Sequence, residues 1–358
     1  MAGFENWLVA NSSYMANAEN VVRMLTLFAP GQNNDVELVS EAAGSLLQGL
    51  GVYHSGIVAR VLAEKKLPLS PHARYIKAQM EESKSYAAVA YTLSAVRCTE
   101  LLIEMLARQK GGEDGRWKAV TGVESVKAVL RLLLLAIAQR PVAMPPVFER
   151  EMDPEAVEQL VLGVDNPAEA ALQEGPKPPI PQRLERSGKT FPPLEASLNV
   201  EFARETMAAK MLKAEDLRPA AQLIRKLQAK TFAGDLLSIL RPVIYSLLAY
   251  KYRKNKQSWT PWLTGVLLEV LGRQLSAQGF TAAGRNSVSS VELEQLKRKT
   301  SSLWSWALRD PLYNSLTRPF IVGFANKLNR VPLLNMFSVL VHDYLYLLDT
   351  YYFPSASI

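Results

Sequence analysis

Apolar residues recur along most of the chain at the three- and four-residue spacing of an amphipathic helix, and the alternation typical of a β-strand is nearly absent. The spacing predicts helices over about residues 17–29, 71–109, 117–139 and 231–252. Further helices are expected to begin near Asp35, Thr260, Ser289, Asp310 and Val331. We therefore expect an all-α fold, a multi-helix bundle of long amphipathic and apolar helices associated with a membrane.

Several helix boundaries carry specific local chemistry. Ser70-Pro71 matches an N-cap followed by proline at the first helical position. Ser289 and Glu292 have the spacing of a capping box, and Gly111-Gly112 interrupts an otherwise continuous helical pattern. Pro242 lies inside the helix predicted over 231–252, where it removes a backbone donor, so we expect a structural kink there.

Proline is concentrated in the middle of the chain. Eleven of the 21 prolines lie between Pro141 and Pro193, and such a stretch cannot build a packed core. We predict three regions: an N-terminal helical region over 1–140, a proline-rich flexible linker over 141–197 and a C-terminal basic helical region over 198–358.

The most apolar segments are interrupted by charge. A membrane-spanning helix requires about 20 mostly apolar residues, whereas Arg131, Arg241, Glu269 and Asp343 each lie inside such a segment. A charge at the bilayer centre costs at least ~2.5 kcal/mol on insertion scales. No segment meets the requirement cleanly, so integral and peripheral attachment both stay open.

The helix predicted over 117–139 has a narrow polar stripe. Glu124, Lys127 and Arg131 fall on one face, and the remaining arc is apolar: Val126, Val129, Leu130, Leu133, Leu134 and Ile137. Lys127 and Arg131 are like charges one turn apart, so we expect them to face lipid phosphates or a carboxylate. The apolar arc fits lipid contact, and a core helix of a soluble bundle would show the same arc.

Aromatic and basic residues alternate after the helix predicted over 231–252. Rings favour the headgroup zone of a bilayer, and clustered cations attract anionic lipid. A solvated loop whose tryptophans pack into the core would contain the same residues. We predict a membrane interface made of Lys127, Arg131, Tyr250, Lys251, Tyr252, Arg253, Lys254, Lys256, Trp259 and Trp262.

Charge is distributed unevenly along the chain. The net charge is +7, but residues 201–330 carry roughly 21 basic and 9 acidic side chains, whereas the first 200 residues are slightly acidic. This asymmetry points to an anionic partner. The basic residues alternate with long apolar runs, so we expect membrane lipids or a protein and no nucleic acid.

Signatures of enzyme chemistry are missing from the sequence. His54, His72 and His342 are scattered and none has a second ligand at metal-site spacing. Cys98 is the single cysteine, and no phosphate-binding loop or nucleophile elbow is present. We expect no catalytic site, metal, cofactor or small-molecule substrate.

Several segments in a fixed order carry a family resemblance. They are RW (116–117) with ESVKAVLRLLLL (124–135), LRPVIY (240–245), QSWTPWL (257–263), ELEQLKRKTSSLWSWALRDPLYNSLTRP (292–319) and LLDTYYF (347–353). Together they resemble the peroxin-sixteen family of peroxisomal membrane biogenesis proteins over essentially the whole chain except its proline-rich middle. Thr260 departs from the family pattern, which has a basic residue there.

The resemblance implies a peroxisome biogenesis factor at the peroxisomal membrane, reached directly or through the endoplasmic reticulum. Such a factor helps to recruit and insert peroxisomal membrane proteins, with the docking peroxin for their import chaperone as partner. The alternatives are a soluble helical scaffold that binds protein partners without direct lipid contact, and a protein that modifies or transfers lipid.

Overall fold

The fold is an array of long helices. A computed structural model describes residues 2–27, 34–65, 69–150, 153–155, 157–158, 182–183, 190–191, 219–255, 257–281, 289–328 and 335–356. Its helices are α1 (Ala2–Ala10), α2 (Ser12–Leu27), α3 (Asn34–Glu64), α4 (Pro71–Glu82), α5 (Lys84–Ala138), α10 (Ala229–Lys251), α11 (Thr260–Thr281), α12 (Ser290–Ser301), α13 (Arg318–Leu328), α14 (Asn335–Thr350) and α15 (Phe353–Ala356). The all-α prediction is confirmed.

Shorter elements complete the description. Two 3₁₀ helices, η1 (Ala220–Gln222) and η3 (Ser302–Leu308), and one π-helical turn, η4 (Tyr313–Thr317), connect the longer helices. Strands β1 (Gln182–Arg183) and β2 (Thr190–Phe191) form a two-residue antiparallel pair. Of the predicted linker, the structure describes 141–150 and a few later residues; the rest lies outside the described residues.

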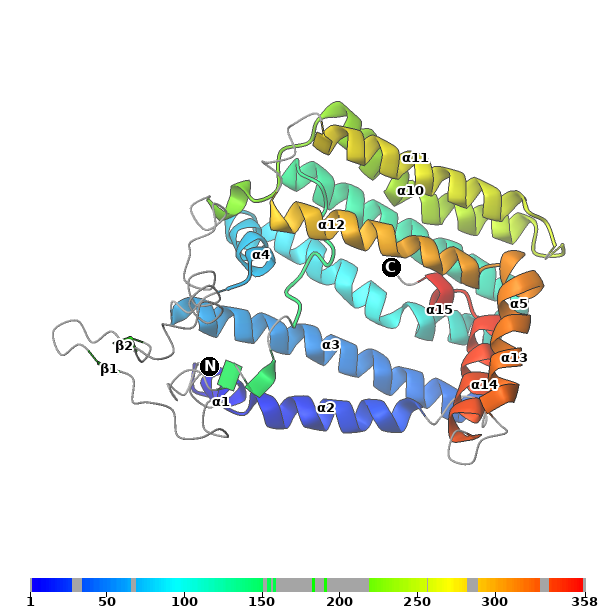
Figure 1. Ribbon diagram of the computed structural model, residues 1–358, viewed down its shortest axis with the longest axis horizontal. Coiled ribbons are helices and arrows are strands. Elements are labelled where there is room, and N and C mark those ends of the chain that lie inside the picture. The colour runs from blue at the N-terminus through cyan, green and yellow to red at the C-terminus, as the bar shows by residue number, and fades with distance from the viewer. Residues whose placement is uncertain are drawn as a thin grey trace.

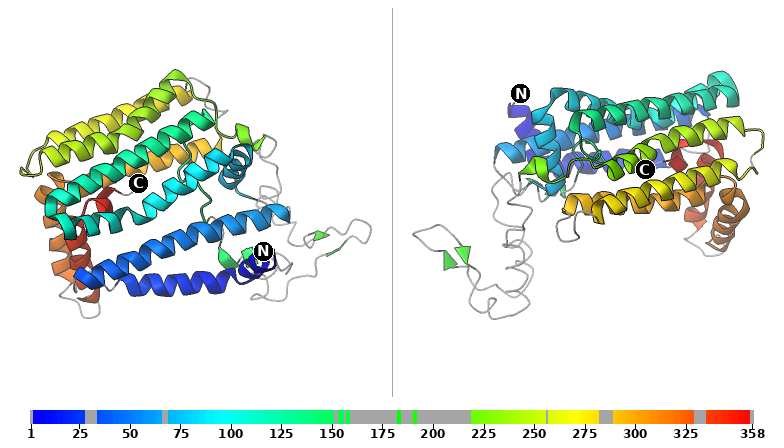
Figure 2. Two further views of the ribbon diagram at one scale, coloured as in Figure 1. Left: turned by 180° about the vertical axis from the view of Figure 1, so that it is seen from behind. Right: turned by 90° about the horizontal axis from the view of Figure 1, so that it is seen from above.

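The helices are arranged side by side. Seen from behind, α2, α3, the two halves of α5, α10 and α11 follow one another across the molecule (Figure 2). Helix α12 crosses in front of α5, and α13 and α14 stand across one end of the array (Figure 1). Helix α5 therefore lies in the middle, with α3 packed on one side of it and α10 on the other.

Helix α5 folds back on itself at Gly112. This residue has φ 58° and ψ −151°, a backbone conformation that residues other than glycine rarely adopt. The two halves, α5a (84–111) and α5b (113–138), run antiparallel, and a Cβ at Gly115 would lie 2.7 Å from the carbonyl oxygen of Ala107. The predicted interruption at Gly111-Gly112 is confirmed, and so is the end of the helix at Gln139.

Other predicted boundaries also agree with the structure. The Ser70 hydroxyl accepts a hydrogen bond from the Ala73 amide at 3.0 Å, and Ser289 and Glu292 exchange the two hydrogen bonds of a capping box. One boundary was missed: Ser83 caps α5 and separates it from α4, so the helix predicted over 71–109 is two helices.

Helices α10 and α11 approach each other through small residues. A Cβ on Gly234 would lie 2.5 Å from Ser276 Oγ and 2.7 Å from the Gly272 carbonyl oxygen. A Cβ on Gly279 would lie 2.3 Å from the Thr231 methyl carbon. Close backbone approach through small residues is typical of helix pairs in membranes.

Helix α10 runs through Pro242 as one element and is long and apolar enough to cross a membrane. Its best 18-residue window has a mean hydropathy of 1.4, and 28% of that window is buried. No segment was expected to meet the requirement for a membrane-spanning helix cleanly, but α10 meets it by length and composition. It is the one such helix among the described residues.

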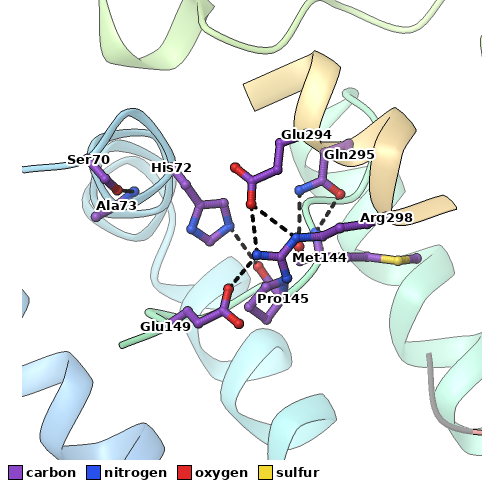
Figure 3. Close-up of polar contacts among 9 residues, drawn as sticks. All are labelled: Ser70, His72, Ala73, Met144, Pro145, Glu149, Glu294, Gln295 and Arg298. Carbon is purple, nitrogen blue, oxygen red and sulfur yellow. Dashed lines mark hydrogen bonds and ion pairs between the residues drawn. The ribbon is translucent and has the colours of Figure 1, made fainter. Parts of the chain in front are cut away.

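The segment that follows α5 is fixed by side chains from α4 and α12 (Figure 3). The Gln295 amide accepts from the Met144 backbone N–H at 3.0 Å and donates to the Met144 carbonyl at 3.1 Å. Arg298 joins Glu149 at 2.7 Å, and His72 Nε2 lies 3.1 Å from the Pro145 carbonyl oxygen. The first part of the predicted linker is therefore held against the bundle.

The α10–α11 contact predicts opposite effects for two glycine substitutions. Gly234→Ala should lower the free energy of unfolding by about 1–3 kcal/mol, because the new methyl group meets backbone atoms of α11. Gly49→Ala, in an exposed turn of α3 with nothing within 4 Å of the added Cβ, should be neutral or stabilising. Unfolding in detergent followed by circular dichroism measures both, and equal effects would contradict the close contact.

Candidate membrane-facing surface and buried ionic network

The polar stripe of α5b points into the protein. Lys127 Nζ donates to Glu100 Oε2 of α5a and to Glu124 Oε1, both at 2.8 Å. All three side chains are largely shielded from solvent. Of the two partners expected for Lys127, a lipid phosphate or a carboxylate, the structure provides the carboxylate.

Arg131 is also buried, with 8% of its surface exposed. Burial, together with the nearby charge of Arg97, lowers the pKa of Arg131. The structure therefore corrects the sequence analysis: Lys127 and Arg131 lie between the halves of α5 and do not belong to the membrane-facing surface.

The opposite face of α5b exposes its apolar side chains. Val126 and Val129 are 49% and 56% exposed, and Leu133 and Ile137 lie on the same face. We call these four residues the outer stripe. Leu134 of the predicted apolar arc is fully buried and Leu130 packs against the core, so α5b buries its charges together with part of its apolar surface and leaves the outer stripe exposed. Contiguous exposed apolar surface of this kind marks a site of contact with lipid or protein.

Exposed apolar side chains also follow α11 and the segment around α13. Leu263, Leu267, Val270 and Leu271 recur at helical spacing along α11. Leu316, Phe320 and Phe324 do the same around α13, where Phe320 is 76% exposed. Neither set was among the residues predicted to face the membrane, although the helical spacing of both sets is visible in the sequence.

The predicted basic and aromatic belt lies at the turn between α10 and α11, and part of it faces outward. Lys251 and Lys254 are exposed, and Trp259 is about half exposed. Tyr250 and Tyr252 are half-buried, and the Lys251 ammonium lies 5.9 Å from the centre of the Tyr252 ring. Their contact with lipid headgroups stays a prediction.

Two belt residues instead bind within the protein. Arg253 stacks over Tyr250 at 4.6 Å and pairs with Asp114 at the tip of α5 at 2.6 Å. Trp262 Nε1 donates to the Trp306 carbonyl at 3.0 Å. These contacts fasten the turn to the α5 hairpin and to η3. Lys256 lies outside the described residues.

Glu104 is the most deeply buried carboxylate of the hairpin, with no exposed surface. Its Oε1 accepts from Arg116 Nε at 2.8 Å and from the Tyr352 amide at 2.6 Å, and its Oε2 accepts from the Phe353 amide at 3.0 Å. Burial raises the pKa of Glu104, and Arg116 and the two amides only partly offset it. One carboxylate therefore joins both halves of α5 to the start of α15.

The charges that interrupt α10 and α11 neutralise each other. The Arg241 guanidinium pairs with the Glu269 carboxylate, which also contacts Arg273 Nε at 3.2 Å. Burial lowers the pKa of Arg241 to about 10. The pairing explains how two apolar helices can each contain an internal charge.

Histidines serve as structural partners. His54 Nδ1 lies 2.7 Å from Glu19 Oε1, and Glu19 also pairs with Arg150. Across the described ranges, no three His, Cys, Asp or Glu side chains gather as metal ligands would.

Removing the Glu104 carboxylate should be strongly destabilising. Glu104→Ala leaves Arg116 and two amides buried without their acceptor, and we expect a loss of about 3–5 kcal/mol in unfolding free energy. Glu113→Ala is the matched control, because Glu113 also contacts Arg116 but is mostly exposed, and it should cost less than about 1 kcal/mol. Thermal unfolding of both variants tests the difference.

Comparison with known proteins identifies the family of the chain. The family model described as "Peroxisomal membrane protein (Pex16)" matches residues 2–350. The peroxisomal membrane protein PEX16 of Schizosaccharomyces pombe is 19% identical over 95% of this chain and 94% of its own. Peroxisome biogenesis protein 16 of Arabidopsis thaliana is 22% identical over 93% of this chain and 94% of its own. No solved structure matches. The chain therefore belongs to the Pex16 family of peroxisomal membrane proteins.

Proposed function

We propose that the chain is a membrane-attached recruitment factor in peroxisome biogenesis. It helps to bring newly made peroxisomal membrane proteins to the peroxisomal membrane, directly or by way of the endoplasmic reticulum. Its protein partner in this role is the docking peroxin that receives the cytosolic import chaperone. Membership of the family and the name of the Arabidopsis thaliana relative, a peroxisome biogenesis protein, support the role in biogenesis.

The observation that carries the proposed attachment is the outer stripe of α5b. Lys127 and Arg131 are buried between the halves of α5, while the outer stripe stays 37–56% exposed. Each of its four apolar side chains gains free energy on leaving water. A bilayer can cover such a stripe without any change in fold.

The α10–α11 turn supports the same attachment through charge. Lys251 and Lys254 are exposed on the same turn as the half-exposed Trp259. An exposed ring with neighbouring cations fits the headgroup zone, where the ring lies at the interface and the cations meet lipid phosphates. Arg253 and Trp262 position the turn through their bonds to Asp114 and Trp306.

A soluble scaffold remains the competing proposal, because a partner protein could cover the outer stripe instead of lipid. That scaffold would stay dispersed without detergent and would have no affinity for vesicles. The two proposals therefore differ in a property of the isolated protein.

Polar substitution of the outer stripe should release the protein from membranes. For the triple variant Val126→Gln, Val129→Gln, Leu133→Gln, we expect the fraction of protein that floats with vesicles to fall by about tenfold or more. Each change removes apolar area from the contact. In cells that depend on the variant, a fluorescent peroxisomal membrane protein should fail to reach peroxisomes.

The double variant Lys77→Gln, Glu81→Gln is the control, because both side chains are exposed on α4. It should float and deliver the reporter normally. Unchanged flotation of the triple variant would favour the soluble scaffold. Lost flotation with normal delivery of the reporter would contradict the recruitment role.

Charge reversal at the turn should weaken binding in a salt-dependent way. The affinity of the variant Lys251→Glu, Lys254→Glu for anionic vesicles should fall by about tenfold or more at low salt, since each basic residue contributes ~1 kcal/mol near an anionic surface. The deficit should shrink in high salt and be absent on neutral vesicles. Reversal of the cations Lys77 and Lys297 on α4 and α12 is the matched control, and an equal loss there would exclude a specific role for the turn.

A further inference from the structure

Helix α13 stands across the long helices at one end of the array, and the tip of the α5 hairpin and the α10–α11 turn lie at the same end (Figures 1 and 2). Arg253 of the turn, Tyr313 of η4 and Asp349 of α14 line one pocket, so these elements are neighbours. We call the tip (110–118), the turn (251–259), η4 and α13 together the α13 end.

The α13 helix packs on α14 with its small side chains and exposes its large apolar ones. Ala325 is fully buried, whereas Leu316, Phe320 and Phe324 are 66%, 76% and 56% exposed. Helical periodicity places these three side chains on one side of the helix, away from Ala325. Two phenylalanines and a leucine on one exposed face mark a contact with lipid or protein.

The α13 end also carries a surplus of positive charge. The described carboxylates of the tip, of the segment before η4 and of α14 already have partners: Glu113 with Arg116, Asp114 with Arg253, Asp310 with Asn314 and Asp349 with Arg318. Five exposed lysines make no ion pair with any described residue: Lys110, Lys118, Lys251, Lys254 and Lys327. Lysine is depleted in protein–protein interfaces, whereas unpaired cations beside apolar side chains suit an anionic lipid surface.

We infer that α13 lies in the plane of an anionic bilayer surface, with Leu316, Phe320 and Phe324 inserted at the boundary between headgroups and acyl chains. Interfacial helices bury their apolar face about 5–10 Å into this boundary. The unpaired lysines of the tip and the turn then meet lipid phosphates. Because α13 stands across the long helices, a bilayer that covers α13 along its length meets those helices at a steep angle. The inference rests on the proposed membrane attachment and adds which end of the molecule faces the headgroups.

Depth measurements on the full chain test this placement. A dye whose emission depends on polarity is attached to one new cysteine at a time, Leu316→Cys, Phe320→Cys or Phe324→Cys, in the Cys98→Ala background. On vesicles that contain anionic lipid, the emission of all three dyes should shift to shorter wavelength. Lipids brominated near the headgroup end of the acyl chain should quench the three dyes equally, and more strongly than lipids brominated near the chain end. A helix in the membrane plane keeps one depth along its length.

The matched control is Glu81→Cys, because Glu81 is exposed on α4 at the other end of the array (Figure 1). Its dye should neither shift nor be quenched. Absence of quenching at the three α13 positions in a chain that floats with the vesicles would overturn the inference and leave the proposed attachment intact. A depth that changes steadily from position 316 to position 324 would also overturn it, since α13 would then run into the bilayer. A chain that does not float at all would contradict the proposed attachment, and the inference with it.

A polar variant gives a second test that needs no label. The affinity of Phe320→Gln, Phe324→Gln for anionic vesicles should fall by about tenfold or more, because two rings no longer leave water on binding. Both rings are exposed, so the melting temperature in detergent should be unchanged. Tyr14→Gln is the matched control, since it removes a ring that is 73% exposed on α2. Equal loss of affinity in the control would show that the effect does not belong to α13, which would overturn the inference.

Discussion

The arrangement of the molecule depends on where its buried charges find partners. Glu104 joins Arg116, and so both halves of α5, to the Tyr352 and Phe353 amides at the start of α15. Lys127 joins the same two halves through Glu100. These bonds require the polar stripe of α5b to face α5a. Once that stripe faces inward, helical periodicity leaves Val126, Val129, Leu133 and Ile137 on the outside. The outer stripe is thus a consequence of satisfying buried ions.

Much of the fold could be predicted because its boundaries depend on local chemistry. Ser70-Pro71, the Ser289–Glu292 box and Gly111-Gly112 each determine the backbone nearby through their own side chains or lack of them. Ser83 also caps a helix, but it is not followed by a proline as Ser70 is or by a glutamate three residues later as Ser289 is, and this boundary was not predicted. The contact between Gly234 and Gly272 could not be predicted, since it depends on which two helices become neighbours.

The candidate surface was predicted only in part, for a related reason. Periodicity identifies which residues share a face of a helix but not which way that face points, so Lys127 and Arg131 were assigned outward. Lys251, Lys254 and Trp259 are exposed, and their place at a membrane interface stays a prediction. Arg253 and Trp262 are held by Asp114 and Trp306, whose proximity arises from tertiary structure.

The ion pair between Arg253 and Asp114 has a mechanical consequence. It joins the turn between α10 and α11 to the tip of the α5 hairpin, and α10 packs against both α5 and α11, so the apolar faces of α5b and α11 are carried by one packed unit. Neither face can settle at its own depth in a bilayer. Once one face contacts the bilayer, the other face is held near it at a high effective concentration. Release of the protein then requires both faces to detach together.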